Sequence, residues 1–342
     1  MSSIAEQLIS WQKKSGRHHL PWQENSDPYA VWISEIMLQQ TQVSTVIPYY
    51  QRFTERFPDI SSLAQAPIDE VLAHWSGLGY YARARHLHQT ACRIVQNHRN
   101  VFPGQREDIQ QLPGIGRSTA AAIAVFAFGR REAILDGNVK RVFARYFGIG
   151  RYPGESATLK ELWRLAEESL PETGAPDAIK VYTQALMDLG ATVCMRRKPL
   201  CGQCPLQKAC IARIENRIAL LPVPRPKKHL TVKETVFMIY RGKQKLLLER
   251  RPDTGIWGGL WCFPEKRLDD HCIFEMHKAQ PVELPRLLHT FTHFKLSITP
   301  FLQDVSTKKD IPDSLIWVQP NKVLELGIPA PVKKLIQKHF LY

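Results

Sequence analysis

Apolar residues recur at helical spacing through the first two thirds of the chain. Trp32, Ile36 and Val43 follow one another at intervals of four and seven residues, and Val142 and Tyr146 repeat the pattern further along. Such spacing places apolar side chains on one face of a helix. We therefore predict an α-helical region that continues to about residue 215.

The pattern then stops at a proline-rich stretch. Residues 221–228 read Leu-Pro-Val-Pro-Arg-Pro-Lys-Lys, with three prolines in five positions. Proline lacks the backbone N–H that a helix needs, so a helix cannot continue here. A proline-rich segment is also stiff. We predict a stiff, basic linker over residues 219–231.

Short strand-like runs follow the linker. Residues 235–240 and 245–248 are apolar runs around Arg241-Gly242, and residues 294–298 alternate apolar and polar side chains. Alternation with a period of two indicates a strand with one buried face. Residues 332–340 return to helical spacing.

Together these patterns predict a multi-domain protein. An all-α domain would span residues 1–218, and a smaller α+β domain would span residues 232–342.

Composition adds an expected partner and an expected location. Lysine and arginine number 46 against 32 acidic residues, which gives a net charge of +14. This balance suits a polyanion such as nucleic acid, although a basic protein that is merely soluble would look the same. Residues 1–8 show no secretion signal, and the longest apolar stretch, 120–128, is too short to cross a membrane. We expect a cytoplasmic protein with no membrane contact.

Four of the seven cysteines cluster as C-x6-C-x2-C-x5-C at Cys194, Cys201, Cys204 and Cys210. Reducing conditions do not favour disulfides, and thiolates are soft ligands for zinc or iron–sulfur clusters. Structural zinc usually draws on two separated C-x2–4-C pairs, whereas only one C-x2-C occurs here. The spacing therefore favours a 4Fe–4S cluster over zinc, and both stay open on the residues alone.

A glycine-rich segment precedes a second group of candidate residues. Residues 112–116 read Leu-Pro-Gly-Ile-Gly before a helix-forming run. Two glycines permit a tight turn, and free amides at the following helix N-terminus can hold a phosphate oxygen. Asp136 comes about twenty residues later, where it is either the N-cap of a following helix or a functional carboxylate, or both.

Glu35 lies among apolar residues. At helical spacing it neighbours Val31, Trp32, Leu38 and Gln39. A carboxyl group in such surroundings loses hydration, so its pKa should rise and it could hold a proton near neutrality. The alternative is a solvated glutamate on an amphipathic helix.

Several motifs in sequence order resemble the MutY family of adenine DNA glycosylases, within the endonuclease III superfamily. They cover nearly the whole chain and comprise Leu20-Pro-Trp22, the run Ser34–Val43, the run Gly77–Arg85, residues 112–116, the run Ile134–Val142 and the four cysteines. The resemblance implies that residues 108–128 form a helix-hairpin-helix motif, which grips the DNA backbone, and that residues 194–210 form a 4Fe–4S cluster loop. It also implies a helical domain of two lobes, with the N-terminal residues packed on the lobe that carries the cluster.

The resemblance also implies roles for single residues. Glu35 would be the catalytic acid and base, Asp136 would stabilise an oxocarbenium ion, and Asn138 would assist near the sugar. DNA contacts would come from the hairpin residues and from two side chains that enter the base stack: Leu112, Gly114, Gly116, Ser118, Lys140, Gln40 and Tyr80.

Ser118 separates two subfamilies. Endonuclease III-like lyases carry a lysine at this place, whose amine forms a Schiff base with the sugar aldehyde, and a hydroxyl cannot do this. We therefore expect a monofunctional glycosylase. Lys140 could still reach an abasic aldehyde incidentally.

The C-terminal domain resembles the MutT (Nudix)-like domain of the same family. The glutamate-rich run with which MutT-type hydrolases hold metal does not occur in residues 229–342, so we expect recognition and no hydrolysis. The triplet Phe291-Thr292-His293 resembles the family's Phe-Ser-His loop, which contacts oxidised guanine. Threonine keeps the hydroxyl but adds a methyl group.

The resemblance thus implies a base-excision-repair enzyme that removes adenine opposite 8-oxoguanine or guanine and leaves an abasic site. Its partner would be double-stranded DNA at a bacterial nucleoid, and we expect a monomer. Two rival hypotheses are a bifunctional lyase, which Ser118 disfavours, and a non-catalytic DNA-binding or redox-sensing iron–sulfur protein, which the pair of Glu35 and Asp136 disfavours.

Overall fold

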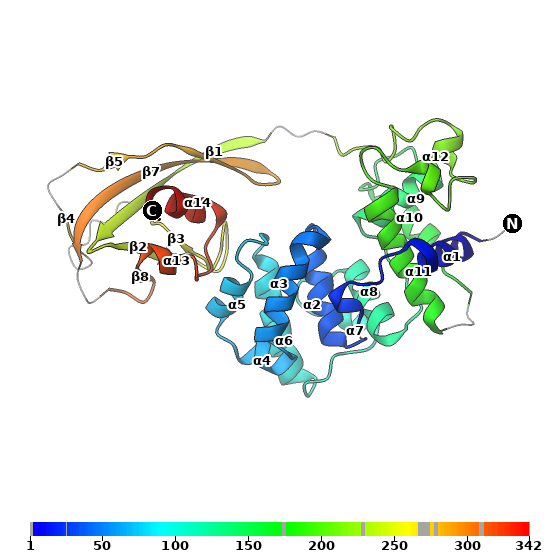
Figure 1. Ribbon diagram of the computed structural model, residues 1–342, viewed down its shortest axis with the longest axis horizontal. Helices are drawn as coiled ribbons and strands as arrows, with labels where there is room; N and C mark the ends of the chain where they lie inside the picture. Colours follow the sequence, from blue (N-terminus) through cyan, green and yellow to red (C-terminus); the bar gives the residue numbers. More distant parts are fainter. Residues whose placement is uncertain are drawn as a thin grey trace. The chain divides into compact units, whose positions relative to one another are not determined.

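The computed structural model describes residues 3–24, 26–172, 176–226, 230–265, 274–276, 280–307 and 311–341. Helices make up the first part of the chain, and strands with two helices make up the last (Figure 1). The helical elements are α1 (Ile4–Ser15), η1 (Pro21–Gln23), α2 (Pro28–Leu38), α3 (Val43–Arg56), α4 (Ile60–Gln65), α5 (Ile68–His74), α6 (Ala82–Asn97), α7 (Arg106–Gln110), α8 (Arg117–Phe128), α9 (Gly137–Tyr146), α10 (Ser156–Glu168), α11 (Pro176–Asp188), η2 (Leu189–Val193), η3 (Cys201–Gln203) and α12 (Ile211–Ile214).

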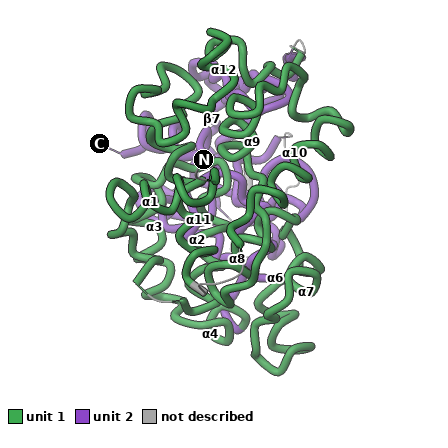
Figure 2. Tube along the Cα trace, turned by 90° about the vertical axis from the view of Figure 1, so that its right-hand side faces the viewer, with its two compact units in different colours: residues 1–64, 89–227 green, residues 65–88, 228–342 purple. Residues whose placement is uncertain are grey.

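Two compact units divide the chain (Figure 2). Unit 1 comprises residues 1–64 and 89–227, and unit 2 comprises residues 65–88 and 228–342. Within unit 2, the Tyr81 hydroxyl donates to the carbonyl of Ile328 at 2.7 Å and Arg85 Nη1 donates to that of Gly258 at 2.6 Å. The domain limits expected from the sequence stay a prediction, and residues 227–229 of the predicted linker lie outside the described residues.

The predicted helix around Trp32 proved to be two helices. α2 ends at Leu38, and Val43, which the periodicity placed on the same helix, begins α3 instead. Gln40 lies between them with a left-handed φ of 58°. A residue in that conformation cannot continue a right-handed helix, so the chain must turn here even though the apolar period continues.

Unit 2 contains a mixed sheet. Its strands are β1 (Thr231–Gly242), β2 (Lys245–Arg250), β3 (Trp261–Cys262), β4 (Phe274–Met276), β5 (Val282–Glu283), β6 (Leu287–Thr290), β7 (Phe294–Thr307) and β8 (Leu315–Val318), and its last helices are α13 (Pro320–Val323) and α14 (Ala330–His339). The strand order is β3-β2-β1-β7-β4, with β5 and β6 on β7 and β8 on β2. The long strands β1 and β7 run parallel (Figure 1).

The predicted strands are confirmed, with one shift. Side chains of β7 alternate between buried and partly buried along its first half, as the period of two predicted. The turn between β1 and β2 lies at Lys243 and Gln244, where φ is 48° and 60°, and not at Arg241-Gly242. Both residues adopt the left-handed conformation that tight two-residue hairpins require.

Each unit has its own core. In unit 1, the N-terminal helix packs as expected, since Ala5 and Leu8 join a core with α9, α11 and the start of the cysteine loop. In unit 2, Leu335 and Ile336 of α14 pack on the sheet residue Phe237. Within the described ranges no helix combines the length and the apolar character that a membrane crossing needs.

Candidate active site

Glu35 lies on a helix that is buried almost all round. α2 begins after Asp27, whose carboxylate accepts from the backbone N–H of Ala30 at 3.0 Å, with Pro28 at the first helical position. Seven of the eleven residues of α2 are buried, and Glu35, which is partly buried, is the only charged residue of the helix. Burial raises the pKa of Glu35 to about 8, and the nearby Asp136 carboxylate adds to the shift. The predicted rise in pKa is thereby confirmed.

Asp136 caps helix α9 in unit 1. Its Oδ1 accepts from the backbone N–H of Val139 at 2.8 Å, so the expected N-cap is present. Burial raises the pKa of Asp136, while hydrogen bonds from Val139 and Asn138 and the charges of Arg141 and Lys140 oppose that rise. The site therefore holds two desolvated carboxyl groups in different surroundings, because only Asp136 has hydrogen-bond donors and positive charges that oppose the rise in its pKa.

A pocket of about 340 Å³ opens beside Glu35. Leu38, Val43 and Phe126 contribute apolar surface, and Arg17 and Gln184 contribute polar groups. Ligand pockets commonly combine a mostly apolar wall with a few polar groups that fix orientation. This pocket could hold a flat, nitrogen-rich ring next to a protonated carboxyl group.

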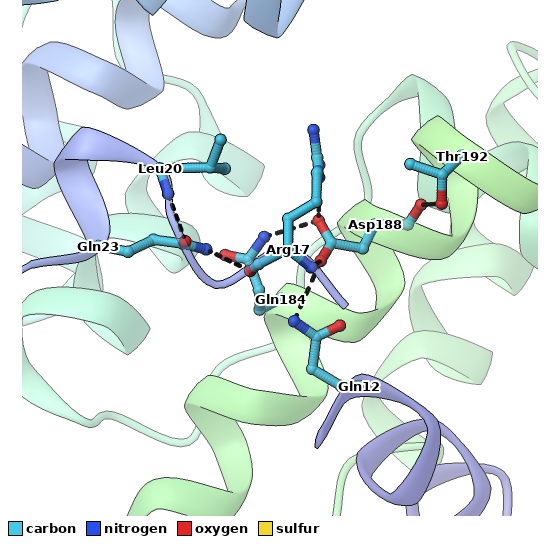
Figure 3. A network of polar contacts seen from close by, with 7 residues as sticks. All are labelled: Gln12, Arg17, Leu20, Gln23, Gln184, Asp188 and Thr192. Atoms are coloured by element: carbon cyan, nitrogen blue, oxygen red, sulfur yellow. Dashed lines mark hydrogen bonds and ion pairs between the residues drawn. The ribbon is translucent and has the colours of Figure 1, made fainter. Parts of the chain in front are cut away.

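Several members of one polar network line this pocket. Figure 3 shows the contacts of that network. Its centre is Asp188, at the end of α11, which is fully buried and forms an ion pair of 2.6 Å with Arg17. Gln184 and Gln12 also donate to this carboxylate, at 2.8 and 3.0 Å. The Gln23 amide donates to the carbonyl of Arg17 at 3.2 Å and so steadies the chain that bears the guanidinium.

Sequence reasoning missed these polar pocket residues. Trp22 belongs to a motif that carried the resemblance, but the sequence suggested no function for Arg17, Gln184 or Asp188. One signal was available, because Asp188 follows the apolar run Ala185-Leu-Met as Glu35 follows its own apolar run. A charged residue inside an apolar helix indicates either a buried ion pair or a site.

The hairpin of the predicted helix-hairpin-helix motif lies between α7 and α8. Gly114 has a φ of 75°, a left-handed conformation that suits glycine, and Gly116 is the N-cap of α8 without a side-chain cap. The first amides of α8 are thus not capped by a side chain, as a phosphate-binding turn requires. The Ser118 hydroxyl accepts from the backbone N–H of Leu135 at 2.9 Å, which connects α8 to the segment before Asp136.

The two residues expected to enter the base stack share an unusual backbone. In unit 1, Gln40 is exposed with a φ of 58°, and in unit 2, Tyr80 is 47% exposed with a φ of 50°. Left-handed φ values are uncommon outside glycine and cluster at functional sites. Arg83 donates to the carbonyl of Gly79 at 3.3 Å and lies over the Tyr80 ring, so the loop is held in place.

The four cysteines line one small pocket in unit 1. Cys194, Cys201, Cys204 and Cys210 surround it together with apolar side chains and Arg145. Burial, together with the charges of the other three thiols, raises the pKa of Cys204 to about 11. Within the part of the chain that the structure describes, no group of three or more His, Cys, Asp or Glu is arranged to hold a metal ion. The four thiols nevertheless line one common pocket, where they are donors of one kind.

Two arginines of α9 connect the cysteine loop with the site. Arg141 donates to the Asn138 side chain at 2.9 Å and to the carbonyl of Cys194 at 2.8 Å. Arg145 is 3% exposed and donates to the carbonyl of Met195 at 2.8 Å. Asn138 also packs closely on Gly190. A Cβ atom added to Gly190 would lie only 2.6 Å from the Cβ of Asn138. Helix α9 therefore carries Asp136 and Asn138 at one end and anchors the loop along its length.

The triplet Phe291-Thr292-His293 forms the tip of the β6–β7 hairpin in unit 2. Phe291 is half-buried and stacks on Phe294 with 4.5 Å between ring centroids, whereas Thr292 and His293 are exposed. The Thr292 hydroxyl lies 3.3 Å from His293 Nδ1. The aromatic ring anchors the turn, and the hydroxyl and imidazole are presented to solvent.

Two protein families match separate parts of the chain. The HhH-GPD superfamily of base excision DNA repair proteins matches residues 33–168, and the NUDIX domain matches residues 235–338. The first match contains Glu35, the hairpin and Asp136, and the second contains the triplet at the β6–β7 turn.

Similar proteins extend over nearly the whole length. The chain is 38% identical to the adenine DNA glycosylase of Buchnera aphidicola subsp. Acyrthosiphon pisum, covering 98% of this chain and 97% of that one. It is 32% identical to the adenine DNA glycosylase of Mus musculus, covering 99% and 78% of the two chains. Among solved structures, a thermostable thymine-DNA glycosylase is 30% identical with a TM-score of 0.56, covering 62% of this chain and 95% of the other. An endonuclease III–DNA complex, 19% identical, shares the fold with a TM-score of 0.52 over 62% and 94% of the two chains.

Proposed function

The chain belongs to the adenine DNA glycosylase family, and we propose that it removes adenine paired with 8-oxoguanine or guanine in double-stranded DNA. The observation that carries this proposal is the pocket beside Glu35, whose carboxyl group is desolvated enough to hold a proton at neutral pH. Adenine inside a duplex is inaccessible, so it must be flipped out of the stack to enter such a pocket.

Glu35 supplies the first proton. With a pKa of about 8, the Glu35 carboxyl group is protonated in most of the protein molecules at neutral pH. Proton donation to N7 of adenine makes the base a better leaving group. The bond between N9 and the sugar C1′ then breaks, and its electron pair remains on adenine.

Asp136 would stabilise the sugar after the bond to adenine breaks. Loss of adenine leaves positive charge on the sugar ring, which a nearby carboxylate stabilises electrostatically or by a transient covalent bond. Burial raises the pKa of Asp136, and the donors and positive charges around it limit that rise by favouring the charged form. Glu35, now deprotonated, takes a proton from water while the water oxygen bonds to C1′. Where Asp136 has bonded to C1′, that bond breaks in the same step and the carboxylate is released. The products are free adenine and an abasic site.

Strand cleavage is not expected to follow. The Ser118 hydroxyl accepts a backbone hydrogen bond from Leu135 and cannot form a Schiff base. Lys140 is partly buried near Asp136. Its amine could react incidentally with the aldehyde of the abasic sugar.

We further propose that the four cysteines bind a 4Fe–4S cluster. Thiolates are the ligands that such clusters use, and all four thiols line one pocket with mainly apolar walls, so the residues fit the group in kind. When bound, the cluster would cross-link residues 194–210 and keep their basic side chains on a fixed surface. Arg196, Arg197 and Lys198 are exposed there and could neutralise DNA phosphates.

Specificity for the opposite base is assigned to the tip of the β6–β7 hairpin. Adenine is a normal base, so a glycosylase that reads adenine alone would also attack correct pairs. 8-Oxoguanine differs from guanine by a hydrogen on N7 and an oxygen on C8. The exposed Thr292 hydroxyl can accept from that N–H, while His293 holds the loop or a phosphate. Excision of this adenine before replication would prevent G:C to T:A mutations.

One assay tests this function. Purified protein is incubated with duplexes that carry adenine opposite 8-oxoguanine, guanine or thymine, with alkali added or withheld afterwards. We expect adenine loss from the first two duplexes and strand breaks only after alkali. Equal removal of adenine opposite thymine, or strand breaks without alkali as fast as base loss, would contradict the proposal.

A further inference from the structure

A cluster of aromatic rings supports the tip of the β6–β7 hairpin in unit 2. Trp257 lies in the segment between β2 and β3, and its ring centroid is 5.5 Å from that of Phe291 and 5.6 Å from that of His289. The rings of His289 and Phe291 lie edge to face, with 4.6 Å between their centroids. At these distances the three rings contact one another in pairs. One of them, Phe291, directly precedes Thr292 in the sequence.

Trp257 also connects the hairpin tip with the core of unit 2. Its ring lies 6.2 Å from that of Phe237, which is fully buried. The backbone N–H of Phe291 donates to the carbonyl of Phe294 at 2.9 Å and so closes a loop of two residues. Because Thr292 is the first residue of that loop, the direction of its hydroxyl depends on where Phe291 is held.

The backbone of Trp257 has a strained conformation. Its φ is 56°, in the left-handed region that a bulky side chain rarely adopts. Such a conformation persists only where the surrounding structure imposes it. The backbone N–H of Leu260 donates to the carbonyl of Trp257 at 3.0 Å, and Arg85 Nη1 donates to the carbonyl of Gly258 at 2.6 Å. A Cβ added to Gly258 would lie 2.3 Å from the carbonyl oxygen of Asp253, so this segment is tightly folded.

We propose that Trp257 is a positioning residue for the recognition of the base opposite adenine. It holds Phe291 in place, so that the Thr292 hydroxyl is oriented before DNA binds. This inference rests on the proposed function, in which the hairpin tip contacts 8-oxoguanine. A hydrogen bond weakens steeply when its distance or angle is wrong, and a group that is ordered in advance loses less conformational entropy on binding. Trp257 thus strengthens the contact from behind the tip.

Arg85 supports the same segment from a distant part of the sequence. It lies on α6, and it belongs to the same short run of residues as Tyr80. Its guanidinium fixes the carbonyl of Gly258, next to Trp257, within unit 2. Loss of that guanidinium leaves all the rings in place but frees the backbone that carries Trp257. Its effect on the tip should therefore have the same direction as loss of the Trp257 ring.

The test compares Trp257→Ala and Trp257→Phe with wild-type protein. Dissociation constants are measured on duplexes that carry 2′-fluoro-2′-deoxyadenosine, whose fluorine slows loss of the base, opposite 8-oxoguanine or guanine. The preference is the dissociation constant for the guanine duplex divided by that for the 8-oxoguanine duplex. We expect Trp257→Ala to lower the preference about tenfold, as loss of one hydrogen bond would. Trp257→Phe should keep most of it, because a phenyl ring can still pack on Phe291.

Trp317→Ala is the matched control for the loss of a large aromatic side chain. Trp317 lies on β8 and packs on a separate cluster of unit 2 that contains Met238 and Tyr240. It should lower the melting temperature and keep the wild-type preference. The double variant of Trp257→Ala and Thr292→Ala should lower the preference no further than Thr292→Ala alone. Arg85→Met should lower it at least about threefold, which tests the proposal even where Trp257→Ala does not fold.

The outcomes separate the proposal from the function on which it rests. A preference that is unchanged in Trp257→Ala, or in Arg85→Met where Trp257→Ala does not fold, would overturn the positioning role alone. An equal fall in Trp257→Ala and Trp317→Ala would also overturn it, because lost stability would then explain both. A wild-type protein that binds the two duplexes equally would overturn the proposed reading of the opposite base, and the role of Trp257 with it.

Discussion

The pKa of Glu35 follows from a few neighbours. The sequence places this carboxyl group between Trp32 and Leu38 on one helix, which is enough to predict desolvation and a raised pKa. It does not reveal that Asp136, a hundred residues away, adds to the shift, because that approach depends on tertiary packing. It also does not reveal that Arg17 and Gln184 belong to the pocket, because their side chains are oriented by hydrogen bonds to Asp188.

Replacement of Glu35 by Gln removes the transferable proton and keeps the shape. General acid–base catalysis contributes about 100- to 10,000-fold, so we expect single-turnover adenine excision to fall by at least that amount. Binding to the same duplex should be retained. Glu168→Gln, at an exposed ion pair with Arg164, is a matched control and should keep the wild-type rate. Near-normal excision by Glu35→Gln would exclude this residue as the acid.

The two carboxyl groups also predict the pH dependence of the single-turnover rate. Glu35 must be protonated, so the rate should fall as the pH rises above about 8. Asp136 must be charged, and because its pKa is raised, the rate should also fall on the acid side. A rate that stays constant from neutrality to pH 9, with DNA binding unchanged, would contradict protonation by Glu35.

At the scale of elements, periodicity predicted type better than extent. The alternation of β7 and the helical spacing of α14 were readable because one face of each is buried. The break between α2 and α3 was not predictable. Gln40 turns the chain there with a left-handed backbone conformation, which glutamine does not ordinarily favour. Tyr80 is a second case of the same kind. Functional loops thus escape periodicity because their geometry is imposed by surrounding contacts.

The cysteine loop offers a test at this scale. Protein prepared anaerobically should be brown and contain about four irons per chain, as a 4Fe–4S cluster requires. Cys201→Ser should lower DNA affinity or thermal stability more than the excision rate of bound substrate, because the proposed chemistry uses Glu35 and Asp136. Cys92→Ser, outside the cluster loop, should retain iron. Stoichiometric zinc without iron would overturn the cluster assignment.

At the scale of the whole molecule, the change from helical spacing to strand-like runs and the proline-rich stretch predicted two parts, and the structure has two compact units. Their membership was not predictable in full. Residues 65–88 belong to the helical sequence yet group with residues 228–342, through side chains such as Tyr81 that donate to backbone carbonyls. Every residue has a backbone carbonyl, so the sequence does not show which carbonyl accepts such a hydrogen bond. The grouping of residues 65–88 with unit 2 is therefore visible only in the structure.

The central claim is that this adenine glycosylase selects its substrate by the base opposite adenine, through the hairpin tip of unit 2. Binding affinities and single-turnover rates of wild-type protein and Thr292→Ala, measured on 8-oxoguanine·A and G·A duplexes, test it most directly. Loss of one hydrogen bond should weaken binding to the 8-oxoguanine duplex about tenfold. Binding to G·A should change little, and Thr290→Ala, on the exposed face of β6, should match wild type on both duplexes. Equal weakening on both duplexes by Thr292→Ala would show that unit 2 only clamps DNA and does not read the opposite base.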